Sequence, residues 1–450
     1  MTDIGSRLDE LRDLGLYRRM RMVSGPQGPR VLLDGKPVLL LCSNNYLGLA
    51  DHPRVREAAA EAAMRWGVGA GASRLVSGTM TIHRRLEDRL SAFERTEACL
   101  LFGSGYMANI GVISALAGRD EVVFSDALNH ASIVDGCRLA RADTFVYDHC
   151  DTEHLAWGLR QADRRGALIV TDSVFSMDGD VAPLAELVEL ARRFDVRLVV
   201  DEAHATGALG PGGRGAVAAA GLEGEVDVIV GTLGKALGSY GAYVCCDTET
   251  AQFLVNTARP LIFSTAPPPP AVAGALAALE LIVEQPRRVE RLQAAAAHLR
   301  AELTLAGVPS PVSTTQIIPL VIGDPELTVR VCEAALARGV FAQAIRPPTV
   351  PIGSSRLRLA VMASQTHGEL AAAAKAIAAA AREAGAEFQR PAPPAPPPAI
   401  RRAEPAPSGR ARSEQPSSPG PGPEVFDFDP GAAPRPELFD FESEPVTRAA

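Results

Sequence analysis

The chain has 450 residues, 47% of them hydrophobic, so it can bury a large core and form one big domain or two ordinary ones. Its formal net charge of -8 provides no basic surface for nucleic acid, and no apolar run reaches the roughly 20 residues of a membrane span. Its seven cysteines form an odd set with no CxxC pair, which argues against a zinc site and a disulfide framework.

The N-terminal segment, MTDIGSRLDELRDLGL, is acidic and amphipathic and lacks the apolar core of a secretion signal. We therefore expect a cytoplasmic protein with neither a nucleic-acid partner nor a membrane partner. We expect residues 1–40 to pack with a small C-terminal domain.

Short apolar runs, often rich in β-branched residues, recur along the next part of the chain, with helical patterns between several of them. Buried runs separated by helices are typical of a mostly parallel sheet that is covered on both faces. The pattern predicts an α/β fold with a large domain over residues 41–285. The predicted strands are Ala98–Phe102, Glu121–Phe124, Ala167–Thr171, Arg197–Asp201, Val226–Gly231 and Gly241–Cys245, with helices such as His83–Glu94 and Pro183–Phe194.

The pattern changes after the proline cluster Pro267–Pro270, where a long Ala/Leu-rich helical stretch begins. We expect a smaller α+β domain over residues 286–388. Beyond it, 16 of the chain's 35 prolines fall in residues 391–450, so we expect residues 389–450 to form a disordered tail. Two acidic, aromatic units in this tail, Pro423–Asp429 and Pro436–Glu442, are compatible with a docking peptide for an unknown partner and with a solubilising tail.

Four polar clusters lie where predicted strands end, and ligands of open α/β sheets gather beyond the carboxyl ends of the strands. The first is Thr232–Gly238, in which Lys235 lies between glycines. A deprotonated lysine there can approach a carbonyl compound closely and form a Schiff base. Taken alone, the segment is more typical of a surface lysine in a loop, and the GxxxxGK[ST] pattern of a P-loop is absent.

The second cluster, Asp201–His204, closes the strand Arg197–Asp201. A carboxylate at that depth needs a cationic partner, and a protonated pyridinium nitrogen is one such partner. His204 could donate to the phenolate oxygen of the same ring. A structural Asp–His pair or a fragment of a metal site remains an alternative from these residues alone.

The third cluster is the glycine-rich turn Phe102–Asn109, where backbone N–H groups at a helix N-terminus can bind a phosphate. The fourth is Ser125–Ser132, in which His130 could stack on a flat ring, although a lone histidine is more often structural. Together the four clusters match the phosphate, ring, basic nitrogen and aldehyde of pyridoxal phosphate (PLP). The sequence therefore predicts a PLP enzyme with no metal.

The motifs around these clusters resemble those of the α-oxoamine synthases, PLP-dependent transferases of fold type I. The resemblance covers about residues 10–385 and implies a homodimer with active sites at the subunit interface. The matching segments are CSNNYLGLA (42–50), GASRLVSGT (71–79), FGSGYMAN (102–109), DALNHASI (126–133), TDSVFSMDGD (171–180), DEAHATGALG (201–210) and GTLGKALGSYG (231–241).

The resemblance implies a role for each matching residue. Lys235 corresponds to the Schiff-base lysine that removes the substrate Cα proton, Asp201 to the pyridinium partner, and His130 to the stacking histidine that could assist at the oxyanion. The further cofactor positions are Gly105, Tyr106 and Thr232 at the phosphate, Ser176 and His204 near the phenolate oxygen, and Ser264 and Thr265 toward the neighbouring subunit's phosphate.

The implied substrate positions are Asn44 and Arg358 for the amino-acid carboxylate, and Arg18 and Thr349 for the acyl group. Arg356 would share a strand face with Arg358, because alternate residues of a strand point to one side, so it remains an alternative.

The stretch AIRPPTVP (344–351) favours the branch of the family that belongs to biotin biosynthesis. That branch condenses L-alanine with a pimeloyl thioester, on CoA or a carrier protein, to give 8-amino-7-oxononanoate, CO2 and a free thiol. The alternatives are 2-amino-3-ketobutyrate CoA ligase, 5-aminolevulinate synthase and serine palmitoyltransferase, followed by a non-catalytic scaffold or a tail-mediated interaction protein.

Overall fold

The computed structural model of the chain describes residues 3–162, 165–309 and 313–389. The sequence predicts that the tail begins at residue 389, but Gln389 is ordered and its backbone N–H donates to the Val321 carbonyl at 2.8 Å. Residues 390–450, with both repeated units, lie outside these described residues. Within the described part, no helix combines the length and the apolar character needed to cross a membrane. All described residues belong to one compact unit, so the domain boundaries expected near residues 41 and 286 stay predictions.

A seven-stranded sheet forms the centre of the larger region, in the order β4-β10-β9-β8-β7-β5-β6. The five strands from β9 to β6 in this order run parallel, whereas β10 is antiparallel to both β9 and β4. The prediction of a mostly parallel sheet is thus confirmed. The strands are β4 (Ala98–Phe102), β5 (Val122–Asp126), β6 (Asp143–Tyr147), β7 (Gly166–Asp172), β8 (Arg197–Asp201), β9 (Val228–Thr232) and β10 (Ala242–Cys246).

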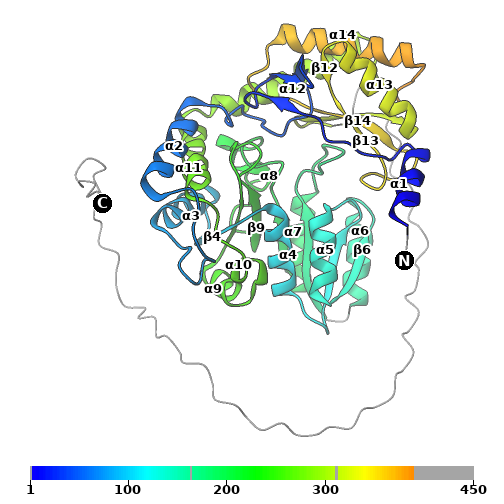
Figure 1. Ribbon diagram of the computed structural model, residues 1–450. Coiled ribbons are helices and arrows are strands. Elements are labelled where there is room, and N and C mark those ends of the chain that lie inside the picture. The colour runs from blue at the N-terminus through cyan, green and yellow to red at the C-terminus, as the bar shows by residue number, and fades with distance from the viewer. Residues whose placement is uncertain (1–2, 163–164, 310–312, 390–450) are drawn as a thin grey trace, which may run out of the picture. The chain divides into compact units, whose positions relative to one another are not determined.

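Helices cover both faces of this sheet (Figure 1). In β8, Leu198 and Val200 belong to the core on one face, and Val199 belongs to a second core on the other. A strand that is buried on both sides needs apolar residues at successive positions, which explains the continuous runs. The core that contains Val199 includes residues of four helices, α4 (Gly105–Leu116), α5 (Ala131–Ala140), α9 (Thr248–Thr257) and α10 (Arg259–Ile262). The core on the other face includes residues of α2 (Pro53–Trp66), α3 (Thr81–Glu94), α6 (Thr152–Gln161), α7 (Leu184–Phe194), α8 (Gly215–Ala219) and α11 (Pro269–Glu284). A short 3-10 helix, η1 (Pro211–Gly213), precedes α8.

The C-terminal residues form a smaller α+β region, and strands from the N-terminal segment join it. An antiparallel sheet has the order β11-β14-β13, and a second sheet has the order β1-β2-β3-β12. Its β3 and β12 pair in parallel, so the first 40 residues pack with C-terminal ones. The elements are α1 (Ile4–Asp13), β1 (Val23–Ser24), β2 (Arg30–Leu33), β3 (Lys36–Leu40), α12 (Arg287–Leu305), β11 (Ile317–Gly323), α13 (Pro325–Ala337), β12 (Val340–Phe341), β13 (Gln343–Ile345), β14 (Ser355–Ala360) and α14 (His367–Ala384).

Two elements differ from the expected pattern. Strand β6 is not among the predicted strands, because it is an edge strand whose residues Asp143, Thr144 and Val146 are exposed. The Ala/Leu-rich stretch after Pro267–Pro270 consists of two helices, α11 and α12, which Gln285 and Pro286 separate. Proline has no N–H to donate inside a helix, so Pro286 ends one helix and begins the next.

Candidate active site

The carboxyl ends of the parallel strands bring the predicted polar clusters to one edge of the sheet. Asp172 closes β7 and Asp201 closes β8, and the two residues are direct register partners. Thr232 closes β9, and Lys235 follows it in the next turn. The spacing of strand ends in the sequence thus places these side chains on a common edge, as expected for a ligand site of this kind of sheet.

Asp201 is buried, and the protein orients its carboxylate. Its Oδ1 accepts a hydrogen bond from the backbone N–H of Ala203 at 2.8 Å, and its Oδ2 accepts one from Asn109 Nδ2 at 2.6 Å. Asn109 also donates to the Ser132 hydroxyl at 2.9 Å. Asn109 lies in the quoted motif FGSGYMAN but was not singled out as a site residue, because its bond to a residue 92 positions away exists only in the fold.

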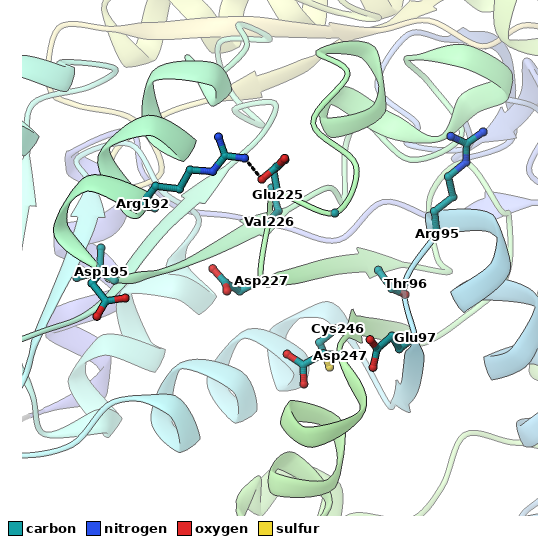
Figure 2. A pocket seen from close by; sticks show the side chains of 13 residues that line it. Arg95, Thr96, Glu97, Arg192, Asp195, Glu225, Val226, Asp227, Cys246 and Asp247 are labelled. Atoms are coloured by element: carbon teal, nitrogen blue, oxygen red, sulfur yellow. Dashed lines mark hydrogen bonds and ion pairs between the residues drawn. The ribbon is translucent and has the colours of Figure 1, made fainter.

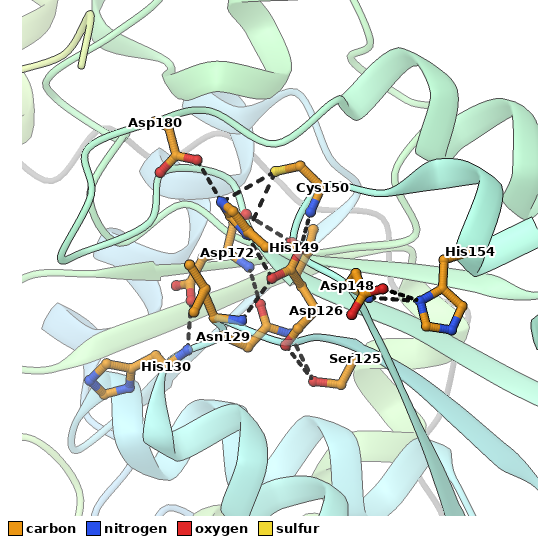
Figure 3. Close-up of polar contacts among 12 residues, drawn as sticks. Ser125, Asp126, Asn129, His130, Asp148, His149, Cys150, His154, Asp172 and Asp180 are labelled. Atoms are coloured by element: carbon orange, nitrogen blue, oxygen red, sulfur yellow. Dashed lines mark hydrogen bonds and ion pairs between the residues drawn. The ribbon is translucent and has the colours of Figure 1, made fainter. Parts of the chain in front are cut away.

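His130 lies at the N-terminus of α5, beside Asp172 (Figure 3). Its backbone N–H donates to Asp172 Oδ2 at 2.7 Å, and its Nδ1 lies 2.7 Å from the Ser132 hydroxyl. Burial, together with the charge of Asp201, raises the pKa of Asp172 well above its ordinary value. Two adjacent buried carboxyl groups ionise together only when a cation lies beside them, so this end of the sheet favours a cationic ligand.

Lys235 is half-buried, and its amine forms no hydrogen bond with any described residue. Desolvation lowers the pKa of Lys235, and the charge of Arg358 lowers it further, whereas the charges of Asp201 and Asp172 act in the opposite direction. An amine with a lowered pKa is neutral in a larger fraction of molecules, which a nucleophile or base requires.

The glycine-rich turn after β4 faces Thr232. Helix α4 begins at Gly105, and its N-cap Ser104 accepts a hydrogen bond from the Met107 N–H at 3.2 Å. A Cβ placed on Gly105 would lie 4.0 Å from the Thr232 Cβ, so a side chain there would occupy the space between the two. Tyr106 offers only its backbone to this turn, because its hydroxyl donates to Asp135.

Arg358 extends from β14 to the same site. Its Nη1 donates to Asn44 Oδ1 at 3.1 Å, its Nη2 to the Tyr46 hydroxyl at 3.4 Å, and its Nε to the Ser176 carbonyl at 2.5 Å. The Tyr46 hydroxyl also lies 2.6 Å from His204 Nδ1. Arg358 thus contacts two of the predicted site residues, Asn44 and Ser176, directly, and is connected to a third, His204, through Tyr46.

Arg358 has no carboxylate partner among the residues that the structure describes, so its charge is available to a ligand. Arg356 instead pairs with Asp178 and donates to the Met177 carbonyl at 3.3 Å. This difference favours Arg358 over Arg356 as the carboxylate-binding residue. Burial holds the pKa of His204 well below its ordinary value, and the charges of Lys235 and Arg358 add to the effect, so this ring is neutral.

Arg18 and Thr349 lie away from this cluster and line a cavity of about 780 Å³ between the N-terminal segment and β13. The Arg18 Nη2 donates to the Pro347 carbonyl at 3.2 Å. Ser264 and Thr265 lie on the segment between α10 and α11, where the Ser264 hydroxyl donates to the Pro260 carbonyl and Thr265 pairs with Ser73. No hydrogen bond connects these two residues with Lys235 or Asp201.

A partly buried ion-pair network stabilises the loop that carries Ser176 (Figure 3). His149 contacts Asp126 Oδ1 through Nδ1 at 2.9 Å and Asp180 Oδ2 through Nε2 at 2.7 Å. Desolvation lowers the pKa of His149, but the two carboxylates outweigh it and raise the pKa to about 12. The ligand atoms of Asp126, His149 and Cys150 lie within 4.8 Å of one another, and both ring nitrogens of His149 are engaged by the carboxylates of Asp126 and Asp180.

A further cavity, of about 710 Å³, lies at the opposite edge of the sheet (Figure 2). Its lining includes Asp195 and Asp227, which precede β8 and β9, and Asp247, which follows the antiparallel strand β10. It is therefore on the side of the amino ends of the parallel strands and is separate from the candidate active site.

The residues at the carboxyl edge fit PLP. The Gly105–Thr232 gap and the start of α4 suit a phosphate, because helix N-termini bind anions. The paired carboxyl groups of Asp172 and Asp201 need a cation, and a protonated ring nitrogen supplies one. Lys235 is the amine at this edge with a lowered pKa.

The chain is similar to known proteins over most of its length. The model of the aminotransferase class I and II family matches residues 36–377. The 8-amino-7-oxononanoate synthase of Citrifermentans bemidjiense is 50% identical over 388 residues, which cover 86% of this chain and 100% of that protein. The 8-amino-7-oxononanoate synthase of Anaeromyxobacter dehalogenans is 52% identical over 378 residues, covering 83% of this chain and 95% of that protein.

Solved structures resemble the fold over most of the described residues. Serine palmitoyltransferase (SPT) from Sphingomonas wittichii has a TM-score of 0.81 at 30% identity, covering 85% of this chain and 99% of that one. A structure of SPT with PLP has a TM-score of 0.81 at 33% identity, covering 85% and 97%. The 8-amino-7-oxononanoate synthase of Francisella tularensis has a TM-score of 0.66 at 25% identity, covering 77% and 98%.

Proposed function

This chain belongs to the aminotransferase class I and II family, and we propose that it catalyses the PLP-dependent, decarboxylative condensation of L-alanine with a pimeloyl thioester. The products are 8-amino-7-oxononanoate, CO2 and a free thiol, in the biosynthesis of biotin. The observation that carries the proposal is the identity of 50–52% with 8-amino-7-oxononanoate synthases over 95–100% of their length. The chain is an acyltransferase of the α-oxoamine synthase family.

The site residues divide into those that hold the cofactor and those that act on the substrates. Lys235 would carry PLP, Asp201 would pair with its ring nitrogen, and His130 would stack on its ring. When bound, PLP accepts into its ring the negative charge that develops at the amino-acid Cα. The remaining cofactor positions are the backbone of Gly105 and Tyr106, with Thr232, at the phosphate, and Ser176 and His204 near the phenolate oxygen.

Arg358 binds the carboxylate of L-alanine, because a planar guanidinium matches a carboxylate and no described carboxylate occupies it. Asn44 orients that guanidinium through its bond of 3.1 Å. Lys235 then removes the Cα proton, a step that its lowered pKa favours. His130 assists at the oxyanion that forms on the thioester carbonyl. Arg18 and Thr349 bind the acyl group in the cavity that they line.

We propose that the active enzyme is a homodimer in the cytoplasm. Ser264 and Thr265 follow Phe263, which is 70% exposed, and neither forms a hydrogen bond with Lys235 or Asp201 of its own chain. This position supports a role at the phosphate of a neighbouring subunit's cofactor. The donor thioester is carried by CoA or by a carrier protein.

A serine palmitoyltransferase is the second candidate, because the SPT structures have the higher TM-score, 0.81 against 0.66 for the synthase from Francisella tularensis. Sequence favours the first candidate, since the identity is 33% with that SPT and 50% with the synthase from Citrifermentans bemidjiense. The shared cofactor residues cannot distinguish the two reactions.

The proposal is tested by assaying the PLP-loaded chain with L-alanine, glycine or L-serine. Each amino acid is combined separately with pimeloyl-, acetyl-, succinyl- and palmitoyl-CoA and with pimeloyl carrier protein. We expect release of CO2 and thiol with L-alanine and a pimeloyl donor, and formation of 8-amino-7-oxononanoate. A preference for glycine with any donor, or for L-serine with palmitoyl-CoA, would overturn the assignment.

A further inference from the structure

The cavity that Arg18 and Thr349 line is rich in arginine, but its arginines differ in their partners. Arg21 pairs with Glu333 and, at 3.3 Å, with Asp34. Arg19 lies 3.8 Å from Glu333. Arg18 and Arg346 have no carboxylate partner among the residues that the structure describes, although both line the cavity.

The two unpaired guanidinium groups influence each other. Burial lowers the pKa of Arg346, and the neighbouring positive charge of Arg18 lowers it further. Two like charges that face one cavity repel each other, and an anion bound between them would relieve the repulsion. The cavity therefore suits a ligand with a negatively charged end.

Each of the two arginines donates hydrogen bonds to the part of the chain that carries the other. Arg346 donates through Nη1 to the Gly15 carbonyl and through Nη2 to the Tyr17 carbonyl at 3.4 Å. Arg18, the next residue, donates back to the Pro347 carbonyl at 3.2 Å. The guanidinium of Arg346 thus holds the backbone on which Arg18 lies against the loop that carries Thr349.

We propose that Arg346 is a positioning residue for acyl-donor recognition: by clamping the carbonyls of Gly15 and Tyr17, it fixes Arg18 where it can bind the free carboxylate of a dicarboxylic acyl thioester. The inference rests on the proposed function and deepens it. Arg346 acts through Arg18, and its planar, two-pronged donor set is what a lysine cannot reproduce.

Steady-state kinetics of the PLP-loaded full chain test this role. Loss of a hydrogen bond to a charged group weakens binding by a factor of roughly ten to a hundred. Arg346→Ala should therefore raise the KM for pimeloyl-CoA by about that factor, with little change in kcat. Heptanoyl-CoA, which has no terminal carboxylate, should lose little. Arg346→Lys should resemble Arg346→Ala, and Arg18→Ala combined with Arg346→Ala should cost no more than Arg18→Ala alone.

The matched control is Arg7→Ala, which removes the same charge from α1 at an exposed position. It should leave both kinetic constants unchanged. Full activity of Arg346→Lys would show that charge alone matters and would overturn the proposal. A fall in kcat with unchanged KM, or equal losses with pimeloyl- and heptanoyl-CoA, would overturn it as well.

Hydrogen exchange tests the clamp without turnover. The N–H groups of Leu16 and Tyr17 both bond to the Leu11 carbonyl at 2.8 Å, so they should exchange faster in Arg346→Ala and Arg346→Lys than in Arg7→Ala. Unchanged exchange would overturn the clamp. Faster exchange in a chain that does not use pimeloyl-CoA would reject the proposed function and support the clamp.

Discussion

At the scale of single residues, the chemistry of Lys235 depends on its surroundings. Its half-buried amine makes no hydrogen bond with a described residue, and desolvation lowers its pKa, whereas the charges of Asp201 and Asp172 raise it. The other two lysines of the chain, Lys36 and Lys375, are exposed. Only one of the three lysines therefore has the environment of a nucleophilic amine.

Replacing Lys235 with alanine should abolish covalent trapping of PLP by borohydride, because no other lysine of the described residues lies at the carboxyl ends of the parallel strands. The measurement is mass spectrometry of the reduced chain after digestion. Lys36→Ala and Lys375→Ala are matched controls and should retain the reduced cofactor on Lys235. Reduced PLP on another lysine of the Lys235→Ala chain would contradict this assignment of the cofactor.

Sequence reasoning locates the residues that end strands, and it does less well with residues that act through others. Asp201 and Lys235 could be predicted because an apolar strand precedes each. Asn109 and Tyr46 could not, since their roles depend on contacts with Asp201 and His204, which are distant in sequence. Asp172 gave a usable signal, because it closes a strand as Asp201 does.

At the scale of elements, buried strands could be predicted and partly exposed ones could not. Strands β4 and β8 have the predicted bounds, because their continuous apolar residues are required by two covered faces. Edge strand β6 carries exposed polar residues and gives no such run. The end of α3 adds a feature without a sequence signal: Glu94 is buried and accepts a hydrogen bond from the Tyr243 hydroxyl of β10 at 2.5 Å.

The burial of Glu94 predicts a pH-dependent stability. Burial is the main cause that raises the pKa of Glu94 from 4.5 to about 8. The folded chain thus holds this proton more tightly than the unfolded chain does, so its contribution to stability is complete below pH 4.5 and is lost as the pH rises through about 8. The Glu94→Gln variant has no carboxyl group to ionise at this position. The difference in free energy of unfolding between this variant and the unmodified chain should therefore increase by roughly 4 kcal/mol, in favour of the variant, between pH 5 and pH 9.

Urea unfolding at pH 5, 7 and 9 measures the difference. The control is Glu61→Gln, on the exposed face of α2, whose free energy of unfolding should differ from that of the unmodified chain by the same amount at each pH. An offset for Glu94→Gln that stays constant from pH 5 to pH 9 would show that Glu94 titrates normally in the folded chain.

At the scale of the molecule, the candidate site draws on segments from both ends of the described chain. Arg18 comes from the N-terminal segment, Lys235 from the large sheet, and Arg358 from β14 of the C-terminal region. The pairing of β3 with β12 joins the first and last of these regions. Sequence patterns predict each region separately, but the contact between Arg358 and Asn44 depends on how the regions pack.

Every candidate site residue lies between Arg18 and Arg358, so deletion of residues 391–450 should leave kcat and KM for L-alanine and the pimeloyl donor unchanged. If the two Phe-Asp-Phe units dock to a partner, the same deletion should abolish retention of that partner by the immobilised chain, and alanine in place of Phe426 and Phe439 in the full chain should do so too. Because the double substitution keeps the length and charge of the tail, it separates recognition from solubilisation. A truncated chain that loses turnover would show that catalysis depends on the tail, and a partner retained by both variants would reject docking.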